Sequence, residues 1–272
     1  MNPALPASAA DDPLLSRIED AALNASATPE QRWLDGWLLR FNPGKAKRAR
    51  CMHALADGRL PLADRLQRAI AAYRACGLPP IFRITPFSRP ADLDDQLAAA
   101  GWLRQDDTRV MVWRDGCTTL PSVPARADPV QESPPAGQLT PVDPQTFAEQ
   151  VGTLRGTPPA QRLDHARRLL AVPVPARALV MHEGTSVLAC GQVVIDGDVA
   201  GLYDIHTAEH ARRRGLAAVL CRALLAQAAA QGARHAYLQV DADNDAARTL
   251  YGRLGFVDAY AYHYRIQPED PM

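Results

Sequence analysis

The sequence predicts an α/β fold with a mixed sheet, present as two tandem copies. Strand patterns at 178–182 and 186–195 are joined by a short turn, which is typical of an antiparallel hairpin. A strand pattern at 199–207 leads through a helix pattern into a strand at 236–240, and this order predicts a parallel pair. The order of helix, strand, helix and strand then recurs in the two halves of the chain, which indicates an internal repeat.

Glycines at equivalent places define the repeat. Gly77 precedes Gly232 by 155 residues, and Gly101 precedes Gly255 by 154. Gly101 and Gly255 are each followed by an aromatic residue and a strand pattern. We therefore expect a first copy at 12–114, a proline-rich linker at 115–144 and a second copy at 145–267.

The first copy begins with a helix that Asp12 and Pro13 open. The remaining elements expected in it are strands at 35–41 and 49–55, a helix at 61–76, a strand at 81–84, a helix at 92–100 and a strand at 108–113. Between the first two strands lies the basic run Lys45–Arg50. Such a run is usually a solvated loop or strand edge, and a patch for an acidic substrate or a nucleic acid is the alternative.

The second copy is expected to begin with helices within 145–170 and to end with a strand at 260–265. Tyr260, Tyr262 and Tyr264 share one face of that strand, and they belong either to the core or to an acceptor pocket.

A strand-to-helix turn, Arg212–Ala217, organises the second copy. Apolar β-formers precede it, and Leu216, Leu220 and Leu224 follow it at helical spacing. Backbone N–H groups at a helix start have no intrahelical partner and favour negative charge, so this turn is suited to a phosphate group. Gly215 and Ala217 keep bulky side chains away, and three arginines are at hand. A pyrophosphate is the expected ligand.

Two patterns together identify a family resemblance. The turn Arg212–Ala217 matches [QR]-x-x-G-x-[GA], and Asn244–Phe256 matches N-x-x-A-x-x-L-Y-x-x-x-G-F. In this order and at this separation, residues 178–265 resemble the core of the GCN5-related N-acetyltransferases, the GNAT superfamily. Together with the internal repeat, the resemblance implies two tandem acyl-CoA N-acyltransferase folds, the first of them a divergent copy.

The resemblance also implies a ligand and residue roles. It implies acetyl-CoA as the acetyl donor, with its pyrophosphate on the amides of Arg213–Ala217 and its pantetheine arm along the strand at 199–207. It further implies that Tyr251 is the general acid toward the CoA sulfur. The implied cofactor-binding residues are Ile205, Thr207, Arg212, Arg213, Arg214, Gly215, Leu216, Ala217, Asn244, Ala247 and Tyr251.

The general base stays open at this point. Counting back from the turn, relatives place a base where this chain has Tyr203 or Gly201; glycine has no side chain, and a tyrosine is a poor base near neutral pH. Asp204 and His206 alternate to the opposite face of the strand in a regular β conformation. A water chain is an equal alternative.

The first copy departs from the family pattern. Where the second copy has its glycine turn, the first has Asp57–Leu62, which lacks the required Gly and Ala, and Leu97 stands at the position equivalent to Tyr251. We expect this copy to be structural or to shape the substrate cleft.

Composition limits the other possibilities. Lys plus Arg and Asp plus Glu are balanced at 30 each, so no global charge favours nucleic acid or an anionic membrane. Apolar runs of membrane-spanning length and a signal segment are both missing, which favours a cytoplasmic protein. Five scattered cysteines argue against structural zinc. The expected reaction is acetyl transfer to a primary amine of a small molecule or amino acid derivative; a protein acceptor and a non-catalytic acyl-CoA-binding module are the alternatives.

Overall fold

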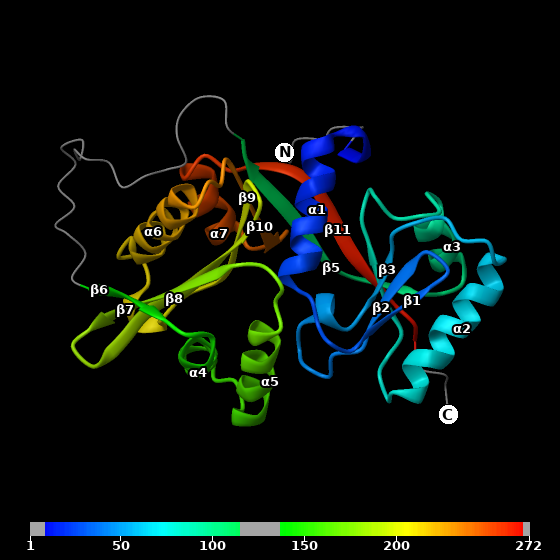
Figure 1. Ribbon diagram of the computed structural model, residues 1–272, viewed down its shortest axis with the longest axis horizontal. Helices are drawn as coiled ribbons and strands as arrows, with labels where there is room; N and C mark the ends of the chain where they lie inside the picture. Colours follow the sequence, from blue (N-terminus) through cyan, green and yellow to red (C-terminus); the bar gives the residue numbers. More distant parts are fainter. Residues whose placement is uncertain (1–8, 115–136, 269–272) are drawn as a thin grey trace.

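The computed structural model describes residues 9–114 and 137–268, which form one eleven-stranded mixed sheet with helices on both faces (Figure 1). The strand order is β1-β2-β3-β4-β11-β5-β10-β9-β8-β7-β6. The strands are β1 (Gln31–Leu34), β2 (Trp37–Arg40), β3 (Met52–Ala54), β4 (Ile81–Ile84), β5 (Leu103–Trp113), β6 (Gln138–Val142), β7 (Ala176–Glu183), β8 (Ser186–Asp196), β9 (Val199–Thr207), β10 (His235–Asp241) and β11 (Val257–Ile266). The helices are α1 (Pro13–Ala25), α2 (Leu62–Ala75), α3 (Leu93–Ala99), α4 (Pro144–Leu154), α5 (Pro159–Leu170), α6 (Leu216–Ala230) and α7 (Asp245–Arg253).

The mixed sheet of two tandem copies is confirmed by the strand pairing. In the second half, β7, β8 and β9 pair antiparallel, and β9 pairs parallel with β10 across α6. In the first half, β3 pairs parallel with β4 across α2. The glycines that define the repeat, Gly77, Gly101, Gly232 and Gly255, all have positive φ angles. They end equivalent helices in the left-handed conformation that glycine tolerates.

The two halves exchange their last strands. β5, which ends the first half, lies between β10 and β11 and pairs antiparallel with both. β11, which ends the second half, pairs antiparallel with β4. Each half therefore completes its sheet with a strand from the other. The boundaries at 12–114 and 145–267 remain predictions. They divide the sequence into repeats, but in the folded sheet each repeat pairs with a strand of the other.

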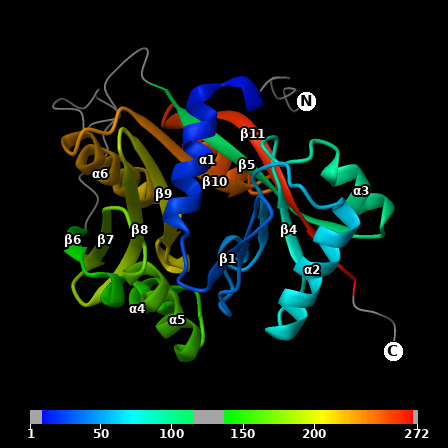
Figure 2. The same cartoon turned by 45° about the vertical axis from the view of Figure 1, so that its right-hand side comes forward.

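Helices cover both faces of the second half. α6 packs against β7, β8 and β9 on one face, and α4 packs against the same strands on the other. α1 also lies over β9 and β8, although the sequence assigned it to the first copy (Figures 1 and 2). This placement follows from its apolar stripe, which includes the buried Leu15 and Ile18 and packs with Val199 of β9 and Tyr237 of β10.

A buried polar cluster joins α1 to the strands at the centre of the sheet. Glu19 forms an ion pair with Arg83 of β4 and accepts a hydrogen bond from the Tyr260 hydroxyl of β11 at 2.7 Å. Both charged side chains are almost completely buried. Since α1 and β4 come from the first half and β11 from the second, this cluster links the two halves.

Two strands were not expected from the sequence. β1 forms a hairpin with β2 at one edge of the sheet, and β6 pairs with β7 at the other. β6 lies within the predicted linker at 115–144, of which residues 115–136 are outside the described residues.

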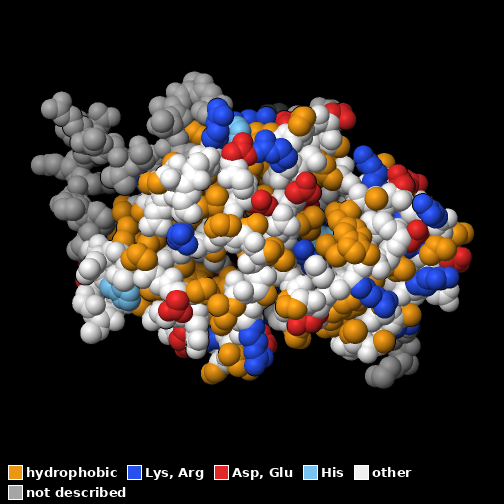
Figure 3. All heavy atoms as spheres, in the orientation of Figure 1, with side chains coloured by type: hydrophobic (Ala, Val, Ile, Leu, Met, Phe, Trp, Pro, Cys, Tyr) orange, Lys and Arg blue, Asp and Glu red, His pale blue; other side chains and the backbone are white. Residues whose placement is uncertain are grey.

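Within the described residues, a membrane-spanning helix and a His/Cys/Asp/Glu cluster able to hold a metal ion are both absent. Four cysteines in that part of the chain, Cys51, Cys76, Cys190 and Cys221, are free thiols. On the face shown in Figure 3, basic and acidic side chains are interspersed.

Candidate active site

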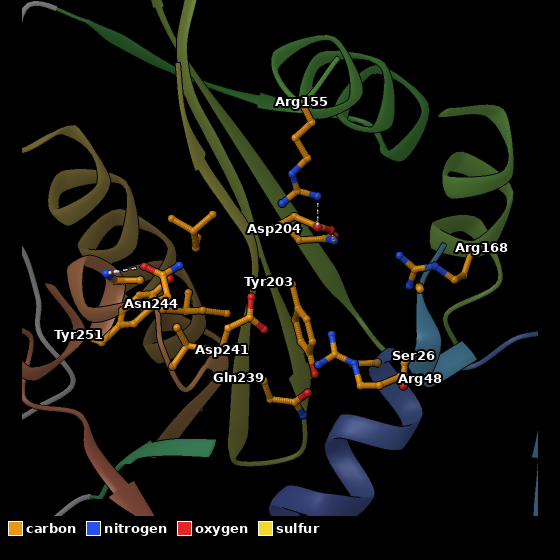
Figure 4. Close-up of a pocket in the computed structure, with 17 residues that line it drawn as sticks. Ser26, Arg48, Arg155, Arg168, Tyr203, Asp204, Gln239, Asp241, Asn244 and Tyr251 are labelled. Atoms are coloured by element: carbon orange, nitrogen blue, oxygen red, sulfur yellow. Dashed lines mark hydrogen bonds and ion pairs between the residues drawn. The ribbon is translucent and has the colours of Figure 1, made fainter. Parts of the chain in front are cut away.

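A cavity opens where β9 and β10 separate. The two strands pair in parallel only from Val199 with His235 to Leu202 with Leu238. Beyond that point both continue without pairing to each other, and a cavity of about 320 Å³ lies between them. Tyr203, Asp204 and Ile205 of β9 and Gln239, Val240 and Asp241 of β10 line it, together with Asn244, Ala247 and Tyr251. Figure 4 shows this arrangement.

A β-bulge in β9 turns Asp204 into the cavity. Gln192 of β8 faces Tyr203 and Cys190 faces His206, so Asp204 and Ile205 together oppose the single residue Gly191. Asp204 has a φ angle of 54°, and a Cβ on Gly191 would lie 2.4 Å from Ile205 Cδ1. Regular alternation was expected to place Asp204 on the face opposite Tyr203. That expectation was wrong, because the bulge brings both side chains to the cavity.

The turn Arg212–Ala217 is an open helix start. Arg213 and Gly215 have φ angles of 63° and 73°, and Gly215 is the N-cap of α6. The Gly215 carbonyl accepts hydrogen bonds from Ala218 and Val219, whereas the amides of Arg213–Ala217 make no backbone hydrogen bond within the described residues. Arg212, Arg213, Arg214 and Gly215 are exposed, and Leu216 is buried, so that only its backbone is available. Unpaired amides at an exposed helix start can bind an anion such as a pyrophosphate.

α7 brings Asn244 and Tyr251 to the other wall of the cavity. Asn244 is the N-cap of the helix, and its side-chain oxygen accepts a hydrogen bond from the Ala247 amide at 3.1 Å. Tyr251 is 8% exposed, and its ring meets Phe256 edge-on at 6.2 Å between centroids. Burial raises the pKa of Tyr251, so its phenol is protonated at neutral pH, as a general acid requires.

Asp204 is held in a cluster of polar side chains. Its carboxylate pairs with Arg155, the residue after α4, at 2.8 Å and accepts a hydrogen bond from Gln192 at 2.9 Å, and His165 of α5 lies 3.3 Å away. Burial raises the pKa of Asp204, but the nearby His165 and the charges of Arg155 and Arg168 outweigh burial and hold that pKa well below its usual range. The carboxylate of Asp204 is therefore ionised at neutral pH and is a weak proton acceptor.

The other two base candidates differ in placement. The Tyr203 hydroxyl lies 2.6 Å from that of Tyr237, and burial raises its pKa to about 12, which opposes deprotonation near neutral pH. His206 lies beyond the bulge and does not line the cavity. Burial and the charge of Arg155 lower the pKa of His206. The His206 ring forms a hydrogen bond with the backbone of Leu154. Thr207 also lies beyond the cavity lining, paired with Ala189.

Residues from three distant segments complete the cavity, and sequence reasoning missed them. Ala25 ends α1 and Ser26 follows it, and Arg48 comes from the basic run of the first half. Arg155 follows α4, and Arg168 lies in α5. The basic run was expected to be a solvated edge. For Arg48 this is wrong, since its guanidinium donates a hydrogen bond to the Tyr262 hydroxyl at 3.2 Å and lies 5.7 Å from the centre of the Tyr203 ring.

Comparison with known proteins decides the family. The model of the Acetyltransferase (GNAT) family matches residues 149–256. The uncharacterised N-acetyltransferase YobR of Bacillus subtilis (strain 168) is 30% identical over 254 residues, which cover 93% of this chain and 98% of the relative. The chain belongs to the GNAT superfamily. It is therefore an acyltransferase, and the predicted enzyme class is confirmed.

Solved structures show the same tandem GNAT fold. A GCN5-related N-acetyltransferase from Kribbella flavida superposes with a TM-score of 0.65 at 18% identity, covering 94% of this chain and 96% of that one. A tandem GNAT protein from the clavulanic acid biosynthesis pathway superposes with a TM-score of 0.58 at 16% identity, covering 76% and 70%. The tandem GNAT fold expected from the sequence is confirmed.

Proposed function

We propose that this GNAT protein transfers an acetyl group from acetyl-CoA to a primary amine of a small molecule or amino acid derivative. The observation that carries the proposal is the end of β9–β10 pairing at Leu202 and Leu238, which opens a cavity lined by the buried phenol of Tyr251. An open helix start with unpaired amides at Arg213–Ala217 lies on the helix that connects the same two strands.

The residues present fit acetyl-CoA, which would supply an activated acetyl thioester. The amides of Arg213–Ala217 would hold its pyrophosphate, with Arg212 and Arg213 exposed beside them. Ile205 and the Asn244 side chain on the cavity walls would hold the pantetheine arm. Tyr251 would donate a proton to the leaving sulfur, since a thiolate leaves faster when it is protonated.

The acceptor amine must be neutral to attack, so it needs a group that removes its proton. Asp241 lines the cavity at the end of β10, and within the described residues its carboxylate makes no ion pair or hydrogen bond. Asp204 is engaged by Arg155 and Gln192. We therefore favour Asp241, directly or through water, as the group that receives the proton, with Tyr203, Asp204 and His206 as the alternatives from the sequence.

The walls of the cavity favour a small acceptor over a protein. They come from both halves of the chain, including Ser26 and Ala46 of the first half and Arg168 of α5. A peptide acceptor requires an open groove along a strand edge. This cavity is instead bounded by strands β9 and β10 on one side and by segments of the first half on the other.

The test combines binding and product measurement. Calorimetry should detect CoA binding to the purified chain, and CoA release from acetyl-CoA should depend on an added amine, with the acetylated amine identified by mass spectrometry. Asp241→Asn should lower turnover at least tenfold with unchanged CoA affinity. Asp243 does not line this cavity, so Asp243→Asn should leave turnover unchanged. Thioester hydrolysis without an acetylated amine, or no CoA binding, would contradict the proposal.

A further inference from the structure

The cavity carries more positive charge than its own carboxylates neutralise. Its charged side chains are Arg48, Arg155, Arg168, Asp204 and Asp241. Arg155 and Asp204 form an ion pair at 2.8 Å. The other two arginines, Arg48 and Arg168, then outnumber the one remaining carboxylate, that of Asp241 at the end of β10. In Figure 4 both of these arginines lie on the side of β9 away from Tyr251.

Neither remaining arginine has a carboxylate partner. Arg168 makes no ion pair or hydrogen bond within the described residues, although Asp204 is close enough to act on it electrostatically. Arg48 donates only to the neutral hydroxyl of Tyr262 and stacks near the ring of Tyr203. Burial and the charge of Arg48 lower the pKa of Arg168, so the two cations are close enough to disfavour each other. Half-buried guanidinium groups without an anion are costly unless a ligand supplies one.

Arg168 also borders a second cavity. A cavity of about 410 Å³ is lined by Lys45 and Ala46 of the first half, by Arg155 after α4 and by His165 and Arg168 of α5. It shares Ala46, Arg155, Arg168 and Asp204 with the cavity at Tyr251, so the two cavities are contiguous. A ligand bound in the cavity at Tyr251 can therefore present an anionic group to Arg48 or Arg168 while its amine lies nearer Tyr251 and Asp241.

We propose that the acceptor is an amine that also carries an oxyanion, a carboxylate or a phosphate, which Arg48 and Arg168 bind. This inference rests on the proposed acetyltransferase function and specifies its substrate class. The planar guanidinium suits both oxyanions, because it can donate two parallel hydrogen bonds to either. The arrangement disfavours polycationic amines, since added positive charge would lie beside two unpaired arginines.

The first test measures anion binding directly. The full-length protein is saturated with CoA, which occupies the anion site at Arg212–Ala217, and is then titrated calorimetrically with inorganic phosphate and, separately, with acetate. We expect at least one of these anions to bind, and Arg48→Gln and Arg168→Gln each to weaken that binding at least tenfold. The matched control is Arg167→Gln, since Arg167 lies on α5 beside Arg168 with a side chain that is 71% exposed. The Arg167→Gln variant should bind the anion as tightly as wild type does.

The second test distinguishes the two oxyanions by acetylation of matched acceptors. Amino acids are compared with their carboxamides, and glucosamine 6-phosphate with glucosamine. We expect the anionic member of at least one pair to have the higher kcat/KM, and the two arginine variants to raise its KM at least tenfold with little change for the neutral member. Thermal melting confirms that each variant is folded.

The inference is overturned if neither anion binds the CoA-loaded protein, if the variants bind as wild type does, or if neutral amines are preferred throughout. In those cases amine acetylation can persist and the proposed function stands. Loss of the proposed function has a different signature, since CoA itself would then fail to bind and no amine would be acetylated.

Discussion

Replacing Tyr251 with phenylalanine tests the assignment of the general acid most directly. The change removes one oxygen and keeps the ring, which is 8% exposed and packs edge-on against Phe256. Within the described residues the Tyr251 hydroxyl makes no hydrogen bond, so we expect the free energy of unfolding to change by less than about 1 kcal/mol. General acid catalysis contributes roughly 10²- to 10⁴-fold, and we expect turnover to fall at least about tenfold, which corresponds to ~1.4 kcal/mol of barrier.

The assay for Tyr251→Phe measures CoA release at saturating substrates, CoA affinity by calorimetry and thermal melting. Tyr251→Leu is the matched comparison, because Leu97 occupies the equivalent position in the first copy. The leucine variant should lose both turnover and stability, since it also loses ring packing, whereas the phenylalanine variant should lose turnover alone. Wild-type turnover in Tyr251→Phe would refute the role of the phenol. A loss of CoA affinity as large as the loss of turnover would mean that the hydroxyl binds CoA rather than transferring a proton.

Three further predictions concern pH dependence and stability. The folded pKa of Asp204 is lowered, so its contribution to stability is present above the unfolded pKa of about 3.9 and is lost as the pH falls through the folded value; wild type should lose more stability than Asp204→Asn between about pH 4 and pH 2 in urea titrations. His206→Ala should leave the ascending limb of the pH–rate profile in place, because the ring does not line the cavity; a displaced limb would make His206 the base. Glu19→Gln should destabilise the fold by about 3–5 kcal/mol, because it leaves the Arg83 guanidinium buried without its counter-ion; a change below ~1 kcal/mol in equilibrium unfolding would show that water reaches the pair.

The parts of the site that lie close together in sequence could be predicted. The turn Arg212–Ala217 and the segment Asn244–Phe256 each form one local unit, a helix start or a short helix with its glycine end. Their geometry depends on residues within a few positions, so residue type and spacing suffice to indicate it. The same holds for most helices and strands of both copies, whose apolar periodicity matches the structure.

The bulge that places Asp204 in the cavity could not be derived from β9 alone. A bulge depends on the facing strand, here on the missing side chain of Gly191, which leaves space for Ile205. An isolated glycine inside the apolar strand pattern at 186–195 was the available signal, since such a glycine often indicates a bulge or a close approach. Strict alternation, which assumes a regular strand, therefore assigned Asp204 to the wrong face.

The contribution of the first half to the cavity is a matter of long-range pairing. Arg48 reaches the cavity from more than a hundred residues before Tyr203 in the chain, and composition could not distinguish it from a solvated lysine or arginine. The exchange of β5 and β11 is similarly invisible in sequence, because either strand could pair with β4 or β10 by the same alternating pattern.

The strand exchange explains how a copy that lacks the cofactor turn can still be needed for activity. β5 of the first half separates β10 from β11, and its Trp113 packs in the same core as Tyr251 and Phe256. Without the first half, β10 would lose its antiparallel neighbour, and the cavity would lose Arg48 together with the wall at residues 25–26. The first copy thus contributes sheet and cavity wall to the second. Its own cofactor turn contributes to neither of these, because the residues that pair with β10 and β11 and that line the cavity lie outside Asp57–Leu62.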